Sequence, residues 1–208
     1  MLTKAIFLVI TPIVAIGLLI WNNTINKVEK PDYQIIKTEN NIEIRHYNPM
    51  LIAEVIESGD RKTAISNGFN VLADYIFGNN STSQKINMTA PVSQTQSEKI
   101  EMTAPVLQKP LVNSWKIQFT MPKKYQIETL PKPNNKRVNI IKQQESKRIV
   151  IQFSGNATNS KIKQNEKKLL NYIKNNNLKV TSKPFYAFYN SPWTPPFLKR
   201  NEIMLLLK

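Results

Sequence analysis

The feature that most constrains the fold is a pattern that occurs twice: a strand-like segment, a Ser-Gly pair and an amphipathic helix. The two copies cover residues 51–77 and 148–177, and their pairs are Ser58-Gly59 and Ser154-Gly155. Further strand-like segments follow each helix. A supersecondary unit that is repeated in this way predicts two related halves, which together form one antiparallel α+β domain.

Each predicted helix has one broad apolar face, as expected for a helix packed on a sheet. In the first helix the apolar residues recur at i, i+4, i+7 and i+11, and they are Ile65, Phe69, Leu72 and Ile76. In the second helix Ile162, Leu169 and Ile173 occupy the corresponding face. These faces predict where the two halves of the core lie.

An octapeptide is also repeated, as KINMTAPV at residues 85–92 and as KIEMTAPV at residues 99–106. Alternate residues in each copy are apolar, including Met88 and Met102, and this period of two predicts two strands. The polar SQTQSE between them has the length of a hairpin connection. The repetition then has an architectural reason, because two antiparallel strands present the same apolar row to one core or pocket.

The segment IEIRHY at residues 42–47 alternates as a half-buried strand does. The alternation places Ile42, Ile44 and His46 on one, core-facing side and the three intervening polar residues on the other. Residues 114–122 continue with the same period, followed by a proline-bounded loop at residues 123–135. The chain closes with an aromatic strand, a proline-rich segment and a last strand.

A run of uncharged residues, AIFLVITPIVAIGLLIW, occupies residues 5–21. As a helix it extends roughly 25 Å, close to the thickness of the hydrocarbon core of a bilayer. We predict that residues 1–26 form an uncleaved single-pass anchor and that residues 27–208 form the domain, on the extracytoplasmic (periplasmic) side. A cleaved signal peptide, which would release a secreted protein, and a buried core helix are the alternatives.

The composition narrows the function classes. The formal net charge is +15, which favours an acidic partner, but no nucleic-acid-binding motif is present and the lysines are dispersed. The chain has no cysteine, one histidine and no recognisable nucleotide or hydrolase motif. We therefore predict a non-enzymatic binding module. Its single histidine, His46, is either a hydrogen-bonded core residue or an axial iron ligand.

Six segments, taken in order, resemble the SOUL family of haem-binding proteins. They are IEIRHYNP, the doubled Met-Thr-Ala-Pro-Val, WKIQFTMPKKY, LPKPNN, QFSG and YNSPWTPPFLKRNEI. The resemblance extends over about residues 33–208. It implies a pseudo-symmetric, distorted antiparallel β-barrel of two βαβ-type halves with two flanking helices, similar to the effector-binding domains of some drug-sensing regulators.

The resemblance also implies noncovalent binding of haem or another tetrapyrrole along the first helix and the adjoining loops. Basic side chains on the outer stripe of that helix would meet the propionates in such a protein; here Lys62 is the basic residue of the stripe, and Lys199 and Arg200 are further candidates. The expected ligand-binding residues are His46, also the expected metal ligand, Lys62, Ile65, Phe69, Met88 and Met102. Two alternatives stay open on the same fold: a carrier or sensor of another apolar small molecule, and a protein-interaction domain.

Overall fold

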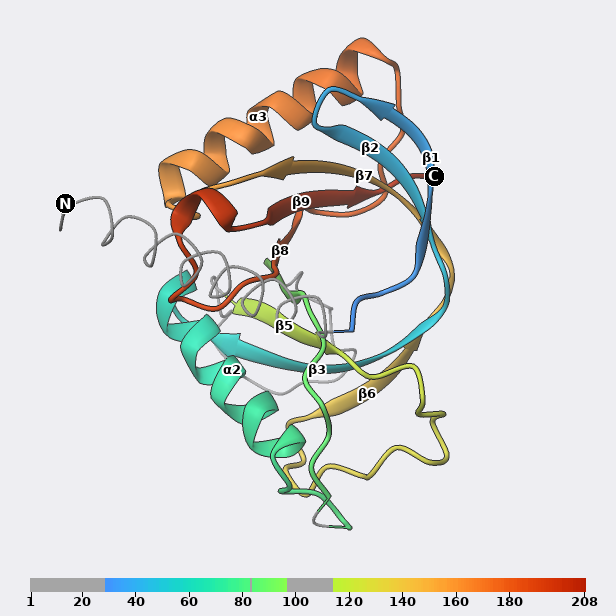
Figure 1. Ribbon diagram of the computed structural model, residues 1–208, viewed down its shortest axis with the longest axis vertical. Coiled ribbons are helices and arrows are strands. Elements are labelled where there is room, and N and C mark those ends of the chain that lie inside the picture. Colours follow the sequence, from blue (N-terminus) through green and yellow to red (C-terminus); the bar gives the residue numbers. More distant parts are fainter. Residues whose placement is uncertain (1–28, 83, 97–113) are drawn as a thin grey trace, which may run out of the picture.

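The computed structural model of the protein describes residues 29–82, 84–96 and 114–208 (Figure 1). Its strands form one antiparallel sheet in the order β1-β2-β7-β9-β8-β4-β5-β3-β6. The strands are β1 (Tyr33–Glu39), β2 (Ile42–Tyr47), β3 (Met50–Ser58), β4 (Val92–Gln96), β5 (Ser114–Thr120), β6 (Asn139–Gln143), β7 (Ser146–Phe153), β8 (Phe185–Phe188) and β9 (Asn201–Leu206). The predicted anchor and the second octapeptide copy, with Met102, lie outside the described residues.

The predicted duplication is confirmed by the topology. One half runs β3-α2-β4-β5 and the other runs β7-α3-β8-β9, where α2 is Arg61–Ile76 and α3 is Asn159–Asn175. In the sheet the two halves meet at the β8·β4 pair, with β9 and β7 on one side and β5 and β3 on the other. Each half is a β-α-β-β unit whose neighbouring strands are all antiparallel.

Helix α2 lies directly on the sheet, over β3 and β5. Asp60 caps its first turn by accepting hydrogen bonds from the backbone N–H groups of Lys62 and Thr63. A Cβ atom at Gly68 would lie 2.6 Å from Cδ1 of the fully buried Ile117, so this position needs glycine for close approach. The helix thereby covers the core of the first half.

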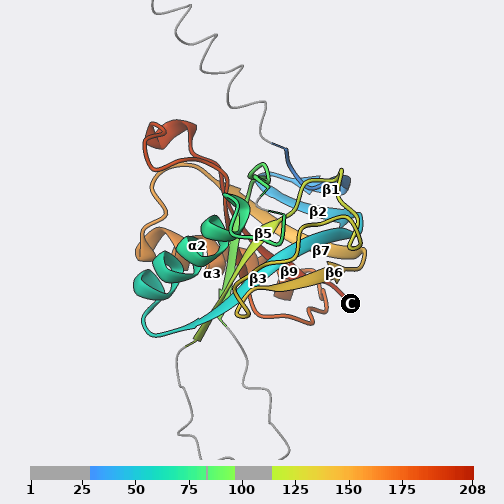
Figure 2. The ribbon, with the colours of Figure 1, turned by 90° about the horizontal axis from the view of Figure 1, so that it is seen from below.

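Helix α3 covers β7 and β9 in the second half. Its buried apolar residues Ile162, Leu169 and Ile173 are those predicted from the sequence. Both helices lie on the same side of the sheet (Figure 2). Within the described parts of the chain, neither helix has both the length and the apolarity needed to cross a bilayer.

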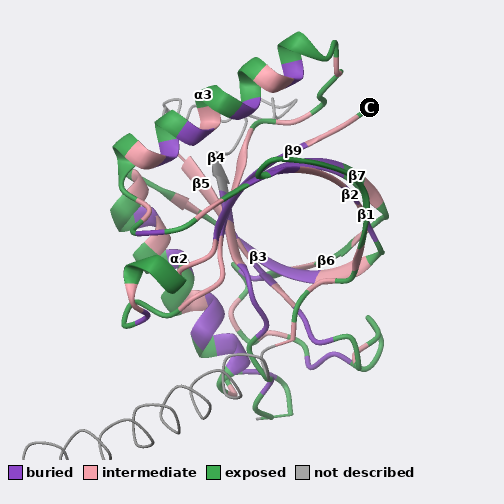
Figure 3. Ribbon diagram, turned by 45° about the horizontal axis from the view of Figure 1, so that its top comes forward, coloured by how far each residue is buried: buried purple, intermediate pink, exposed green. Residues whose placement is uncertain are grey.

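The opposite face of the sheet curls on itself. In Figure 3 the strands β1, β2 and β7 curve around toward β3 and β6, while both helices stay outside the curl. The enclosed face carries its own cluster of buried side chains, among them Tyr47, Val150, Ala187 and Met204. The sheet therefore has two covered faces, and the inner one is a barrel interior.

The octapeptide prediction needs a correction. Only Val92 of the first copy begins a strand, and residues 85–91 are irregular. The backbone N–H of Ile86 donates to the carbonyl of Ile76, and that of Ala90 donates to the carbonyl of Glu29, so neither group joins a ladder. Residues 93–96, predicted as a connection, instead continue β4, because β5 and β8 supply hydrogen-bonding partners on both sides.

The face assignment of β2 also needs a correction. Ile42 and Ile44 face the core as predicted, and there they pack with residues of α3. Arg45 and Tyr47 on the other face, however, are 1% and 2% exposed. The reason is the curl of the sheet, which buries the second face as well. The edge strands β1 and β6 were not predicted; most residues of β1 are exposed and β6 has only five residues, so neither carries a strong apolar period.

Candidate functional site

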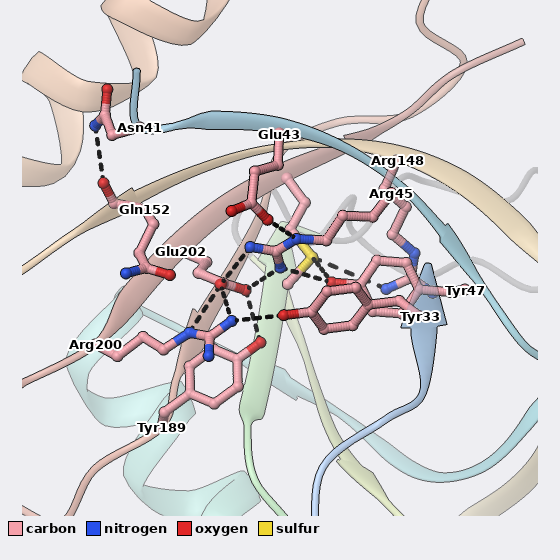
Figure 4. A network of polar contacts seen from close by, with 11 residues as sticks. Tyr33, Asn41, Glu43, Arg45, Tyr47, Arg148, Gln152, Tyr189, Arg200 and Glu202 are labelled. Atoms are coloured by element: carbon pink, nitrogen blue, oxygen red, sulfur yellow. Dashed lines mark hydrogen bonds and ion pairs between the residues drawn. The ribbon is translucent and has the colours of Figure 1, made fainter. Parts of the chain in front are cut away.

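The barrel interior holds a buried ionic network centred on Glu202 (Figure 4). Arg45 donates two hydrogen bonds to this carboxylate at 3.0 and 3.1 Å, and Arg200 donates two at 2.7 and 3.0 Å. The hydroxyl of Tyr189 donates a further bond at 2.6 Å. The side chain of Glu202 is fully buried, so its charge depends on these donors.

Electrostatics keep Glu202 ionised. Burial alone would raise its pKa, but the hydrogen bond and charge of Arg45 and the charge of Arg200 outweigh burial and hold the pKa below its usual value. Burial opposes the charge of Arg45 in turn, yet its pairing with Glu202 raises the pKa of Arg45 above its ordinary value. Each group therefore stabilises the ionised form of the other.

Arg45 has further partners. Glu43 accepts a hydrogen bond from its Nε at 2.6 Å, the hydroxyl of Tyr47 accepts one at 3.0 Å, and the ring of Tyr33 lies 4.4 Å from its guanidinium carbon. The planar guanidinium thus uses its donors on two carboxylates and a hydroxyl. This is the geometry in which a buried arginine is well compensated.

The charge of Arg148 has no carboxylate partner among the described residues. Its Nε donates to the hydroxyl of Ser146 at 3.0 Å, its guanidinium lies 4.3 Å from the ring centre of Tyr47, and Nη1 contacts the sulfur of Met204 at 4.0 Å. Nη2 is buried and has no hydrogen-bond partner in the protein. Burial lowers the pKa of Arg148, against the opposing influence of Tyr47 and Tyr189.

Two adjoining cavities border this interior. The inner one, about 20 Å³, is lined by Arg148, Ser93, Gln118 and Gln143 among others. The outer one, about 510 Å³, opens beside the loop at residues 120–128. Pro31, Met50 and Thr120 line both. The outer cavity therefore adjoins the inner one, which Arg148 lines.

A third cavity is an open groove of about 670 Å³ between α3 and the short 3-10 helix Pro196–Leu198. Its lining includes four cations and no carboxylate, the cations being Lys161, Lys168, Lys199 and Arg200. Phe153, Phe197 and Leu198 add apolar surface, and Phe197 is 76% exposed. Arg200 already serves Glu202, so the three lysines are the cations available to a ligand.

The structure places the expected ligand-binding residues on different elements, with Lys62, Ile65 and Phe69 on α2 and His46 on β2. His46 lies on β2, where its Nε2 is 3.3 Å from Glu145, and it lines none of the three cavities. Lys62 is exposed on α2, Ile65 is half-buried, and Phe69 is 36% exposed and stacks edge-on against Phe119.

Of the two expected methionines, Met88 belongs to the described residues. Met88 is 39% exposed in the irregular segment before β4, and Met102 lies outside the described residues. Lys199 and Arg200, the further propionate candidates, do share one cavity.

Sequence reasoning missed the barrel-facing residues Arg148, Tyr189 and Glu202. A signal was present, because a charged residue stands in each of the apolar strands RIVIQF and NEIMLL. Charged side chains within such strands are rarely buried unless they are paired. The charged residue in each of these strands, Arg148 in β7 and Glu202 in β9, could have indicated a buried charge.

The matches with known proteins fit this architecture. The sequence profile of the SOUL heme-binding protein family covers residues 28–206. The chain belongs to the SOUL family. Heme-binding protein 2 of Mus musculus is 31% identical over 170 residues, and that of Homo sapiens is 30% identical over 168; each match covers 80% of this chain and 78% of the relative.

Solved structures show the same fold at low identity. The C-terminal domain of EcmrR has a TM-score of 0.60 at 10% identity, and the match covers 85% of this chain and 98% of that one. A hydrolase from Listeria innocua has a TM-score of 0.54 at 11% identity, covering 83% of this SOUL-family chain and 94% of the hydrolase. These likenesses concern the fold alone.

Proposed function

We propose that this protein binds haem noncovalently in the groove between α3 and residues 196–198, as a binding protein and not as an enzyme. Membership of the SOUL family and two relatives named Heme-binding protein 2 support the ligand. The observation that carries the site is the groove itself, which combines exposed aromatic surface with cations and has no carboxylate in its lining.

The residues of the groove fit the chemistry of the ligand. Haem is a flat apolar ring with two carboxylate side chains, so it needs an apolar wall and cations at one end. Lys161 and Lys168 form no ion pair with a carboxylate of the described residues, and the ring of Phe197 is open to stacking. Lys199 donates hydrogen bonds to the side-chain oxygen of Asn156 and to the carbonyl of Pro192, and these bonds hold its ammonium in place.

Bound haem would supply an iron centre and a chromophore. The groove lining contains no histidine, methionine or tyrosine, and His46 lines a different part of the surface. We therefore place the binding free energy in the ring contacts and the propionates. Metal-free protoporphyrin should consequently compete with haem for the same site.

The first helix offers a second candidate surface, as the sequence prediction has it. Lys62, Ile65, Phe69 and Met88 would then form the site, with one cation among them. Phe69 and Met88 are only about one-third exposed, and Phe69 is already packed on Phe119. The α3 groove offers more cations and more open aromatic surface, so we favour it.

A hemin titration of the full-length chain, followed by the Soret band, separates these sites. Lys161→Gln/Lys168→Gln should weaken binding roughly tenfold, because two charge pairs with propionates are lost. The matched control is Lys163→Gln/Lys167→Gln, which removes the same charge from exposed positions of the same helix outside the groove.

Further variants complete the comparison. Phe197→Ala should weaken binding, whereas Trp193→Ala, at an exposed position outside the groove lining, should not. Loss on Lys62→Gln and Phe69→Ala instead would move the site to α2. A collapse of the Soret band in His46→Ala would overturn the proposal that no axial imidazole is used. A chain that binds neither hemin nor protoporphyrin would leave another apolar ligand or a protein partner as the function.

We also propose that the groove works at a membrane surface, with residues 1–26 as the anchor and the domain on the extracytoplasmic side. The support is the uncharged run at residues 5–21. Carbonate extraction of membranes from cells producing the full-length chain tests this. Retention in the membrane pellet is expected, and release of a shortened chain would indicate a cleaved signal peptide instead.

A further inference from the structure

We infer that the barrel interior is a second ligand site, which takes the carboxylate of a small organic monoacid on Arg148 and the apolar chain of that acid in the outer cavity. The proposal uses residues that the haem groove does not use as ligand contacts. It therefore stands or falls independently of haem binding.

The charge balance of the interior is the first argument. Its guanidinium groups are Arg45, Arg148 and Arg200, and the carboxylates that pair with them are Glu43 and Glu202. Both carboxylates contact Arg45 or Arg200, and neither contacts Arg148. One positive charge is therefore uncompensated among the described residues of this network, and arginine does not lose its proton in proteins.

Glu54, the other buried glutamate of the described residues, does not supply the missing charge. Glu54 is 3.3 Å from Lys116 and accepts a hydrogen bond from Gln118 at 2.8 Å, so it has its own cation. His46 and Lys147 are the neighbours of Arg45 and Arg148 in sequence and point to the opposite face of their strands. A single negative charge would thus balance this network.

The position of Arg148 is the second argument. The residue lines the inner cavity and is only 8% exposed, and its buried Nη2 has no hydrogen-bond partner in the protein. An unpaired buried charge is costly, whereas a guanidinium bound to a carboxylate is among the stronger hydrogen-bonded pairs. An incoming carboxylate would relieve that cost.

The size and the lining of the two cavities define the ligand class. About 20 Å³ accommodates a group of the size of one or two waters, which suits a carboxylate but not a ring system. The side chains of Ser93 and Gln143 add polar groups there. The adjoining outer cavity of about 510 Å³ contributes apolar surface from Leu51, Met121 and Ile127, beside charged lining residues of both signs at its other positions. A short or medium-chain monocarboxylate matches both parts.

The test is a calorimetric titration of the full-length chain with sodium formate, acetate, butyrate and hexanoate at constant ionic strength, with sodium chloride as the reference salt. Thermal unfolding is recorded with the same salts. We expect saturable binding that tightens about fourfold for each added methylene group, because the chain enters an apolar cavity.

Three variants locate the site. Arg148→Met should weaken binding of hexanoate by about tenfold or more, since a charge-assisted bond is lost. Its ligand-free unfolding midpoint should be unchanged or higher, because an uncompensated buried charge is removed. Ile127→Asp, at a position 48% exposed, should abolish the chain-length gain and leave acetate binding in place. Lys147→Met is the matched control on the outer face of β7 and should change neither.

Each contrary result overturns the inference. No saturable binding would mean that water alone solvates Arg148. Chloride binding as tight as hexanoate binding would reduce the site to one for simple anions. Carboxylate binding that survives Arg148→Met, or that disappears in Lys147→Met, would place the ligand elsewhere.

A hemin titration of Arg148→Met distinguishes this site from the haem groove. Retained hemin affinity in this variant is the expected result and would show that the two sites are separate.

Discussion

Arg45 and Arg148 are directly opposite each other on β2 and β7, but only Arg45 contacts a carboxylate. Like charges in this position repel each other. The network tolerates the pair because Glu202 and Glu43 neutralise one partner and the ring of Tyr47 covers the other. The network therefore compensates the charge of Arg45 and leaves the charge of Arg148 without a carboxylate.

The pairing of Arg45 with Glu202 is expected to dominate the stability of the interior. Arg45→Met should lower the free energy of unfolding by about 3–5 kcal/mol, because it leaves a buried carboxylate with fewer counter-charges. Urea denaturation measures this. Lys37→Met, which removes an exposed ion pair with Glu39, is the control and should change stability little. Equal losses in the two variants would contradict a dominant role for the buried pair.

Acid should destabilise the protein through Glu202. Its pKa in the folded protein is lower than in the unfolded chain, where a glutamate titrates at about 4.3, so the unfolded state takes up the proton first. The stabilisation is complete above that value and is lost as the pH falls through the folded pKa. Thermal unfolding at decreasing pH should show a difference between the wild type and Glu202→Gln that narrows in acid. A pH-independent difference would contradict this assignment.

The elements that could be predicted from the sequence are those whose apolar residues recur at regular spacing. The face of α3, the period of β5 and the duplication follow from side chains that contact their own half of the core, such as Leu169 and Ile117. On α2, Leu72 and Ile76 are buried as predicted, whereas Ile65 is half-buried and Phe69 is 36% exposed. Local period is sufficient there, since one face of each element is apolar and the other is polar.

The barrel interior could not be predicted in the same way. Arg45 and Tyr47 have the period of an exposed face, and only the curl of the sheet encloses them. The backbone of residues 85–91 similarly depends on partners that are distant in the sequence, such as Glu29 for Ala90. Where the contact that decides the structure is nonlocal, the local pattern of apolar and polar residues predicts the wrong face of a strand or the wrong element.

Gly68 should resist substitution by alanine although alanine is the better helix former. The added Cβ would lie 2.6 and 2.8 Å from Cδ1 and Cγ1 of Ile117, which is fully buried. We expect Gly68→Ala to cost about 1–3 kcal/mol of unfolding free energy, measured by urea denaturation. Ile117→Val removes Cδ1 and should partly rescue it in the double variant. Asn67→Ala, on the exposed side of α2, is the control; a comparable loss there would contradict the steric explanation.

Tyr75 should stabilise the protein up to about pH 10 and lose this contribution in alkali. Its hydroxyl donates to the carbonyl of Pro131 at 2.6 Å, which ties α2 to the proline-bounded loop. Burial, with a smaller effect of Tyr125, raises the pKa of Tyr75 to about 12, whereas an unfolded tyrosine titrates at about 10. Its contribution is therefore complete below pH 10 and is lost as the pH rises through the folded pKa.

Tyr75→Phe tests this contribution. At neutral pH the variant should lose about 1 kcal/mol, because the buried carbonyl of Pro131 loses its donor. Between about pH 10 and 12 the difference from the wild type should shrink, because only the wild type loses the contribution of the Tyr75 hydroxyl. The other buried tyrosines affect both proteins equally and leave the difference unchanged. Thermal unfolding over this pH range, with tyrosinate absorbance recorded in parallel, gives both quantities. A difference that grows with pH would show that the hydroxyl of Tyr75 ionises more easily in the folded protein than in the unfolded chain.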